Sequence, residues 1–196
     1  MSEFRRGFKT WCENIAYGFR RDLGLPKFGP LPPEALARHL GITVWTPDDL
    51  PGFDKKHRDQ LLVRDEGSWS AVTLTLPEGR FIIINSAHGT NRRNNDLMHE
   101  IAHIVLEHEP AQMVTSPKGL MFLDNYSEQQ EVEADWLAAA LLAPRQAVLN
   151  FLSANVDIAD AARHFGISDS LMKMVVSRNG IDRQLKHRRS SVRRVV

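Results

Sequence analysis

The pentapeptide at residues 99–103, His-Glu-Ile-Ala-His, restricts the fold of this chain more than any other feature. Apolar residues precede and follow it, which is the pattern of a buried helix. On a helix, His99 and His103 project from one face and can hold one metal ion, while Glu100 reaches a water molecule on that ion. Polar groups in such surroundings are unfavourable unless they are paired or bound to metal. We therefore interpret the pentapeptide as a metal-site helix rather than a chance match.

A second motif, the acidic cluster Glu-Val-Glu-Ala-Asp at residues 131–135, opens an apolar stretch that predicts another helix. Glu131 and Asp135 are four residues apart and therefore share a helix face. A metalloprotease with a glutamate ligand needs one carboxylate on the metal and another that orients a ligand imidazole. We expect Glu131 to be the third ligand and Asp135 to orient a ligand histidine, with the fourth position open for water. Glu133 is the rival ligand, but it lies on a different side of the helix.

Taken together, these motifs resemble the ImmA/IrrE family of metallo-endopeptidases, which are small glutamate-zincins of bacteria and their mobile elements. The resemblance extends over roughly residues 33–180 and is carried by four segments, namely 81–85, 92–98 with the pentapeptide that follows, 131–135 and 141–144. The family often has Gly where Ala102 stands and Asn where Asp135 stands. Neither difference removes a ligand or the base.

The resemblance implies a zinc-dependent endopeptidase of the gluzincin type that cleaves a helix-turn-helix repressor, usually encoded next to it, in a DNA-damage or mobile-element switch. In this mechanism His99, His103 and Glu131 hold Zn²⁺, and Glu100 takes a proton from the bound water. The same donors also suit Mn²⁺ or Fe²⁺. Some relatives carry a sensor domain after this region, for which we expect no room here. The alternatives are a DNA-binding regulator or antitoxin-like partner, or an interaction protein with a structural metal site.

The expected fold is α+β, with a zincin-like metalloprotease core made of a small twisted sheet and two metal-site helices, followed by a helical, helix-turn-helix-like segment. The predicted parts are an N-terminal helix and linker at 1–32, the metallopeptidase domain at 33–144, the helix-turn-helix-like segment at 145–180 and a basic tail at 181–196. An apolar stripe at helical spacing runs along residues 4–23. We expect it to pack on the core, with a dimer or partner groove as the alternative.

The composition favours a cytoplasmic protein. A chain of 196 residues can bury one core of fair size, and a net charge near +1 indicates no particular partner. The longest apolar run is far shorter than the roughly 20 residues that span a bilayer, and the charged start lacks the apolar region of a signal peptide. Cys12 is the only cysteine, so no intramolecular disulfide forms. Its apolar neighbours predict a packed thiol rather than a nucleophile.

Several strands are predicted before the metal-site helix. Residues 69–76 and 80–85 alternate around a short turn and indicate a hairpin. A short helix at 33–41 precedes a strand at 42–46, and the polar residues 47–60 indicate a loop or a short surface helix. In zincins an edge strand beside the cleft pairs with the extended substrate. The strand at 69–76 is therefore a candidate ledge for the substrate.

The connection between the two metal-site helices, residues 109–126, is long enough to indicate a function. It is predicted to be either a lid over the substrate or a surface loop with its own apolar contacts. Tyr126 is a candidate donor to the oxyanion, against the alternative of an ordinary aromatic residue at a helix start, and His88 is a weaker candidate. His108 lies off the ligand face, so we expect it at the surface or rim.

Residues 158–178 predict two helices joined by a turn, as in a helix-turn-helix. The second helix offers only Lys173 and Arg178, whereas helices that read a DNA groove present several donors near their start. We therefore favour packing or substrate docking for this segment, with a weak DNA contact as the alternative. The segment 183–196 is basic and contains no acid, which indicates a disordered end or, alternatively, a phosphate-binding one.

Overall fold

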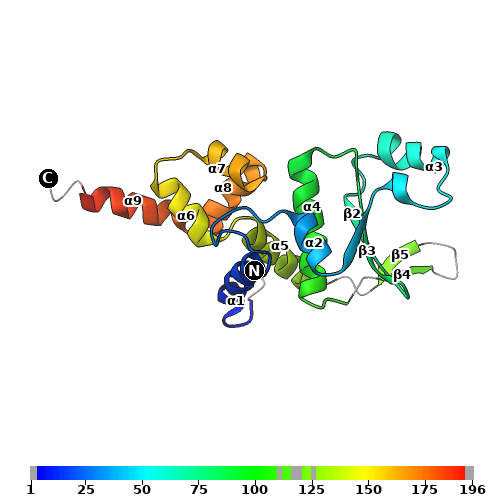
Figure 1. Cartoon of the computed structure of the whole chain (residues 1–196), viewed down its shortest axis with the longest axis horizontal. Helices are drawn as coiled ribbons and strands as arrows, with labels where there is room; N and C mark the ends of the chain where they lie inside the picture. Colours follow the sequence, from blue (N-terminus) through cyan, green and yellow to red (C-terminus); the bar gives the residue numbers. More distant parts are fainter. Residues whose placement is uncertain (1–3, 110–111, 116–120, 125–126, 193–196) are drawn as a thin grey trace.

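The computed structural model describes residues 4–109, 112–115, 121–124 and 127–192, and it has the α+β architecture expected from the sequence (Figure 1). Its helices are α1 (Phe8–Asp22), α2 (Pro33–His39), η1 (Pro47–Asp49), α3 (Lys55–Asp59), η2 (Gln60–Arg64), α4 (Thr90–Val105), α5 (Glu128–Leu142), α6 (Arg145–Ser153), α7 (Ile158–Phe165), α8 (Asp169–Arg178) and α9 (Ile181–Val192). Its strands are β1 (Ile42–Trp45), β2 (Ala71–Leu76), β3 (Gly79–Ile84), β4 (Gln112–Thr115) and β5 (Met121–Asp124). Among these described helices, each falls short of the length and apolarity that a membrane span requires.

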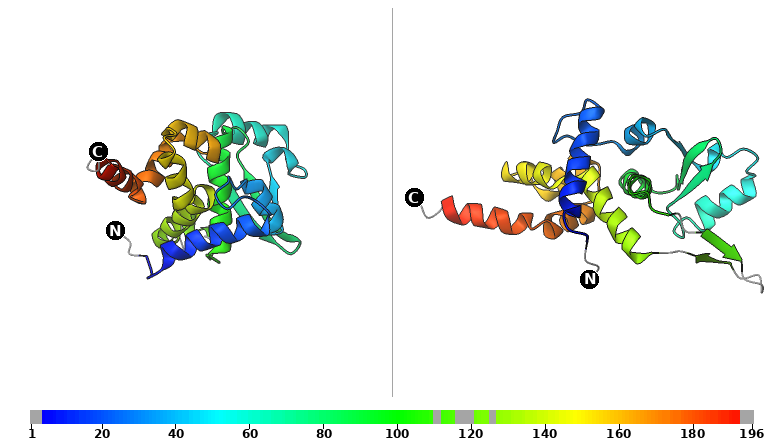
Figure 2. Two further views of the ribbon diagram at one scale, coloured as in Figure 1. Left: turned by 60° about the vertical axis from the view of Figure 1, so that its left-hand side comes forward. Right: turned by 90° about the horizontal axis from the view of Figure 1, so that it is seen from below.

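Three strands form a small sheet beside α4, in the order β1-β3-β2 (Figures 1 and 2). Strand β1 runs parallel to β3, with Ile42 opposite Arg80, while β2 runs antiparallel to β3, with Ala71 opposite Ile84. The predicted hairpin is therefore confirmed. Ile82 and Ile84 are buried because alternate residues of β3 point into the core. Strand β2 lies at the edge of this sheet, on the side of β3 opposite β1.

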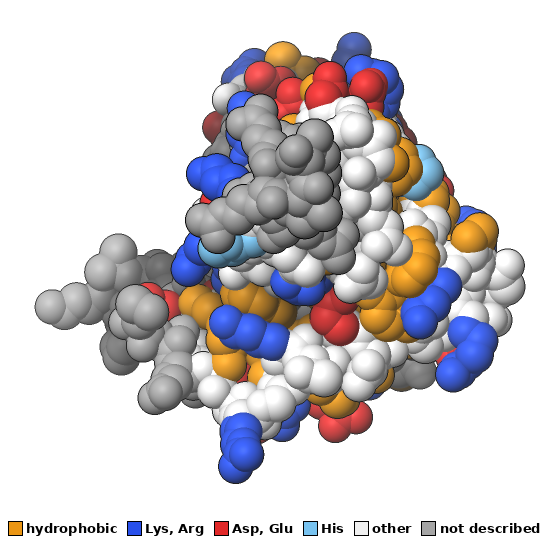
Figure 3. Space-filling model, turned by 90° about the vertical axis from the view of Figure 1, so that its left-hand side faces the viewer, with side chains coloured by type: hydrophobic (Ala, Val, Ile, Leu, Met, Phe, Trp, Pro, Cys, Tyr) orange, Lys and Arg blue, Asp and Glu red, His pale blue; other side chains and the backbone are white. Residues whose placement is uncertain are grey.

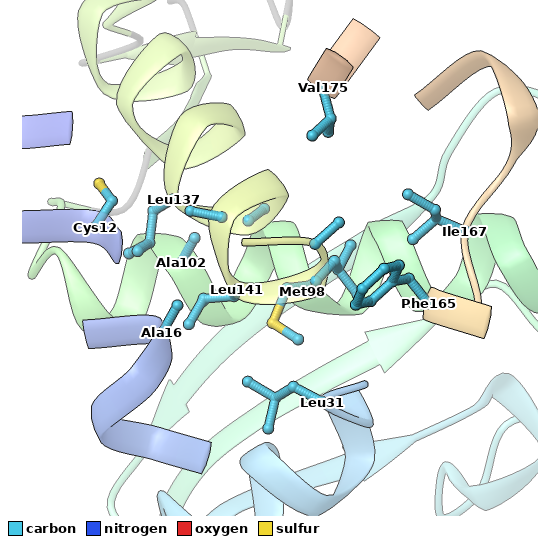
Figure 4. Close-up of a cluster of buried hydrophobic side chains, with 14 of the residues drawn as sticks. Cys12, Ala16, Leu31, Met98, Ala102, Leu137, Leu141, Phe165, Ile167 and Val175 are labelled. Atoms are coloured by element: carbon cyan, nitrogen blue, oxygen red, sulfur yellow. The ribbon is translucent and has the colours of Figure 1, made fainter. Parts of the chain in front are cut away.

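Helices α4 and α5 pack against each other through apolar side chains (Figure 4). Met98 and Ala102 of α4 are fully buried, and so are Leu137 and Leu141 of α5. Full burial of one large apolar side chain contributes roughly 1.5–3 kcal/mol. The contact between these two helices is therefore a main source of stability. Beside this apolar contact, polar side chains of α4 and α5 face each other.

Helix α1 belongs to the same core, which agrees with the packing interpretation of its apolar stripe. Cys12 and Ala16 are fully buried, and α1 runs across α5 (Figures 1 and 4). Arg20 is also completely buried, and it donates hydrogen bonds to the carbonyl oxygens of Leu141 (2.9 Å) and Leu142 (3.3 Å). Because the last carbonyls of a helix have no partner within that helix, Arg20 supplies donors to the end of α5.

The two helices predicted over residues 158–178 form as α7 and α8, and the turn between them docks on α4. Gly166 ends α7 with a φ of 65°, and the Ser168 side chain accepts a hydrogen bond from the backbone at the start of α8. Asn94 of α4 donates to the carbonyl of Gly166 (2.9 Å), and Asn91 donates to that of Ile167 (3.1 Å). The turn is therefore attached to the helix that carries the pentapeptide.

The prediction of a disordered basic tail from Arg183 onward is wrong for residues 183–192, because they belong to helix α9, which projects from the body (Figures 1 and 2). Ile181 is buried and Leu185 packs against the core. Arg145 of α6 also donates to the side chain of Gln184 at 2.7 Å. These contacts with preceding helices give the basic segment an anchor that charge composition alone does not reveal.

The connection between α4 and α5 contains a two-stranded sheet in which β4 pairs antiparallel with β5. We predicted either a lid or a surface loop there, without strands. Strands of four residues are too short for a clear alternating pattern, so the sequence carried little sign of them. In the polar stretch at 47–60, the alternative of a short surface helix is correct, because α3 forms there.

We expect Arg20→Met to lower the free energy of unfolding by about 2–4 kcal/mol, because the variant leaves buried carbonyl oxygens without donors. Arg21→Met is the matched control, since the neighbouring Arg21 side chain is 80% exposed and pairs with the adjacent Asp22. Urea denaturation followed by circular dichroism measures the free energy of unfolding of both variants. Equal midpoints for the two variants would contradict this role of Arg20.

Burial raises the pKa of the Cys12 thiol to about 12. The thiol is therefore protonated at about pH 8, whereas a free cysteine is partly ionised there. We expect iodoacetamide to label Cys12 slowly in the folded protein and rapidly in denaturant, as measured by mass spectrometry over time. Labelling of the native protein at the rate of the denatured one would show that the thiol is accessible.

Candidate metal centre

The pentapeptide lies in the second half of α4, where one side of the helix is buried in the core and the other faces α5. Leu97 and Ile101 are on the buried side. His99 and His103 are four residues apart and lie on the opposite side, with side-chain exposures of 22% and 21%. The local sequence therefore presents two half-buried imidazoles to the neighbouring helix.

Helix α5 begins at a Ser127 cap, whose side chain accepts a hydrogen bond from the backbone of Gln130. Its first turn carries Glu131 toward the two histidines. The three side chains His99, His103 and Glu131 each offer one ligand atom, and these atoms all lie within 4.8 Å of one another. The structure thus brings together the three residues that we predicted as metal ligands.

The spacing of these donors fits a tetrahedral zinc ion. Ligand atoms bound at 2.0–2.1 Å with tetrahedral angles are about 3.3–3.4 Å apart. Here the Nε2 atoms of His99 and His103 are 3.0 Å apart, and the Glu131 carboxylate oxygens lie 3.2 Å from His99 Nε2 and 3.5 Å from His103 Nε2. Two imidazole nitrogens and one carboxylate also form a donor set that catalytic zinc sites use, with a fourth position for water.

Asp135 lies one turn beyond Glu131 on α5, with Oδ1 at 3.1 Å from Nδ1 of His99. A carboxylate at this ring nitrogen directs the Nε2 lone pair toward the donor cluster. Burial of the His99 ring opposes its charged form, but Asp135 and two neighbouring glutamates outweigh this and raise the pKa of His99. The hydrogen bond from His99 lowers the pKa of Asp135. Each of these two groups therefore stabilises the charged form of the other.

Glu100 follows His99 on α4 and points toward the sheet. The hydroxyl of Thr73, on strand β2, donates a short hydrogen bond to Glu100 Oε2. Burial raises the pKa of Glu100, and the bond from Thr73 opposes this rise. Sequence reasoning missed Thr73, because only the packing of the sheet on α4 brings residues this far apart in the chain into contact.

His108 lies against His103, although we expected it at the surface or rim. Its side chain is 7% exposed, and its Nδ1 is 3.0 Å from Nδ1 of His103. Glu133, the rival third ligand, faces His108 rather than the donor cluster, with Oε2 at 3.6 Å from His108 Nε2. The prediction for His108 failed because the chain reverses at Glu107, whose φ is 55°. Non-glycine residues rarely adopt that conformation.

Of the two candidate oxyanion donors, Tyr126 and His88, the described residues include His88 alone. Tyr126 lies outside the described residues, so its proposed role as an oxyanion donor stays a prediction. His88 is buried away from the donor cluster, with Nδ1 at 3.0 Å from Asp96 and Nε2 at 3.1 Å from the carbonyl oxygen of Glu66. These bonds tie the segment before β2 to α4.

Comparison with known proteins identifies one family. The model of a peptidase family, described as the IrrE N-terminal-like domain, matches residues 37–176. Among solved structures, the chain is similar to a Mycobacterium tuberculosis transcriptional regulator, with 14% identity and a TM-score of 0.45. That match covers 86% of this chain and 46% of the regulator, so it spans less than half of the regulator's length. No curated protein matches the chain.

We expect the wild-type chain to retain one zinc ion after gel filtration, and His103→Ala to retain none. Asp135→Ala should bind zinc about 10–100-fold more weakly, because a group that orients a ligand is lost. Glu128→Ala is the matched control, since it removes an exposed carboxylate from the first turn of α5. Elemental analysis and competition with a chromophoric chelator provide the measurements. Equal zinc content in His103→Ala and the wild type would contradict the assignment.

Proposed function

Because the chain belongs to the peptidase family of the IrrE N-terminal-like domain, we propose that it is a zinc-dependent endopeptidase of the cytoplasm that cleaves a helix-turn-helix repressor. The observation that carries the proposal is the convergence of His99, His103 and Glu131 beside Glu100. These side chains are half-buried and adjacent, as hydrolysis of a peptide bond at a metal requires. Mn²⁺ and Fe²⁺ also suit this donor set, so the choice of zinc belongs to the proposal.

When bound, the zinc ion supplies a Lewis acid that polarises the scissile carbonyl and lowers the pKa of a water molecule. In our proposal the Glu100 carboxylate accepts a proton from that water and passes it to the nitrogen of the leaving amine. Thr73 holds Glu100 Oε2, and we assign Oε1 to the water. Asp135 keeps the His99 ring oriented throughout.

We assign binding of the substrate backbone to the edge strand β2. Val72 and Leu76 on this strand are 45% and 42% exposed, so their side chains can contact a peptide. An extended segment that adds to a sheet edge gains main-chain hydrogen bonds and places alternate side chains in contact with the protein. Thr73 on the same strand contacts Glu100, so a peptide paired with β2 would run past the proposed base. This arrangement supports an extended segment of a protein as the substrate.

A DNA-binding regulator remains the second candidate function, and two observations weigh against it. The turn between α7 and α8 is attached to α4 by Asn91 and Asn94, so the start of α8 is packed beside the proposed peptidase core. On the end of the molecule that carries α9, the described Lys and Arg side chains are scattered among acidic and apolar ones (Figure 3). DNA-binding surfaces instead gather basic groups on one face.

The contacts of α7 and α8 favour a packing role within the peptidase. The guanidinium of Arg178, at the end of α8, lies 4.5 Å from the centre of the Trp136 ring on α5. Its charge also contributes to the lowered pKa of Asp135. The turn before α8 therefore contacts α4, and the last residue of α8 contacts α5.

Co-expression with the nearest encoded helix-turn-helix repressor tests the function directly. We expect the wild-type chain to produce repressor fragments on an immunoblot in at least one of two conditions, with and without DNA damage. The condition in which fragments appear then shows whether DNA damage is the activating signal. Glu100→Gln should retain zinc but produce no fragments, because the amide cannot take a proton from water. Cleavage by both forms would contradict the role of Glu100. An intact repressor under both conditions would contradict the proposed substrate, and salt-dependent DNA binding by Glu100→Gln would favour the regulator.

A further inference from the structure

The ring of His108 contacts His103 on the side that faces away from the donor cluster. The two ring centres are 5.0 Å apart with an angle of 71° between the planes, and the closest nitrogens are the two Nδ1 atoms at 3.0 Å. His103 therefore has Nε2 among the donors and Nδ1 on His108. The contact between His103 Nδ1 and His108 Nδ1 is separate from the ligand role proposed for His103 Nε2.

The end of helix α4 places His108 there through its backbone. Glu107 adopts a left-handed conformation, and the backbone N–H of His108 donates to the carbonyl of His103 at 3.1 Å. The N–H of Glu107 donates to Ile104 at 3.2 Å. A left-handed residue with this six-residue hydrogen bond turns the chain back over the last helical turn. The ring of His108 is therefore held against the ring of the residue five positions earlier.

The hydrogen atoms of the two rings can be assigned from the metal site. A histidine that binds metal through Nε2 carries its proton on Nδ1 and must donate it. Nδ1 of His108 is then the acceptor, so a neutral His108 carries its proton on Nε2. That nitrogen faces Glu133 Oε2 at 3.6 Å, and Glu133 Oε1 accepts a hydrogen bond from Gln129 at 2.9 Å. His103 Nδ1 and Glu133 Oε1 thus have hydrogen-bond partners, and His108 Nε2 faces a carboxylate oxygen.

We propose that His108 is a positioning residue for the metal site. Its Nδ1 accepts a hydrogen bond from the Nδ1–H of His103, and its ring is itself oriented by the Glu133 carboxylate. This inference rests on the proposed metal site. In this proposal His108 contacts the ring nitrogen of His103 that faces away from the metal site, just as Asp135 contacts that nitrogen of His99. The two contacting groups differ in chemistry. The partner of His99 is a carboxylate, whereas His103 contacts a neutral imidazole, and the carboxylate of Glu133 lies one ring further from the metal. Two separate outer contacts would then direct the two Nε2 lone pairs at one point.

Zinc affinity of the full chain, measured by competition with a chromophoric chelator, tests the proposal without relying on cleavage. We expect His108→Phe to bind zinc about 10–100-fold more weakly, because an aromatic ring of similar size has no acceptor for His103. His108→Asn should regain most of this affinity, since its side-chain oxygen can take the place of Nδ1. Urea denaturation of the zinc-free variants separates this effect from a loss of packing.

Two results would overturn the positioning role, namely wild-type affinity in His108→Phe or an equal loss in His108→Phe and His108→Asn. If His108→Phe does not fold, Glu133→Leu tests the same series of contacts from its outer end, where the Glu133 carboxylate faces His108 Nε2 at 3.6 Å. It is expected to weaken zinc binding several-fold, and unchanged affinity would reject the proposal. A wild-type chain that binds no zinc would overturn the metal site and the proposed function as well. Tight zinc binding without repressor cleavage would overturn only the proposed substrate.

Discussion

The apolar contact between α4 and α5 determines the position of every donor in the candidate metal centre. His99 and His103 come from one helix and Glu131 from the other, and their ligand atoms are 3.0–3.5 Å apart. A shift of either helix by one turn, about 5.4 Å, would separate them. Half-buried imidazoles and carboxylates do not hold two helices together on their own. Leu137, Leu141 and the apolar side of α4 do so, and the chemistry depends on their packing.

Much of this arrangement could be predicted because its signals are local. The two site helices follow from apolar residues at helical spacing, and a separation of four residues places His99 beside His103 and Glu131 beside Asp135. The hairpin of β2 and β3 follows from alternation around a turn. The family resemblance assigned roles to these residues, and the match to residues 37–176 confirms the family.

The features that escaped prediction depend on contacts between distant segments or on unusual backbone geometry. Thr73 meets Glu100 only because the sheet packs on α4. His108 turns inward because Glu107 takes a conformation that a sequence pattern would assign to glycine. The basic segment after residue 180 is helical because it is anchored to α6 and α8, whereas its composition alone indicates a solvated end. Four-residue strands such as β4 carry too little pattern to be recognised.

Helix α1 lies before residue 37, where the family match begins, yet it shares the core of the matched region. Its buried Arg20 completes the last turn of α5, the helix that carries Glu131 and Asp135. The boundary of the family and the boundary of the folding unit are therefore different. A relative without such a helix must cover the same surface of α5 by other means. Substitutions in the segment before the matched region can thus change the thermal stability of the peptidase during evolution without changing its reactive groups.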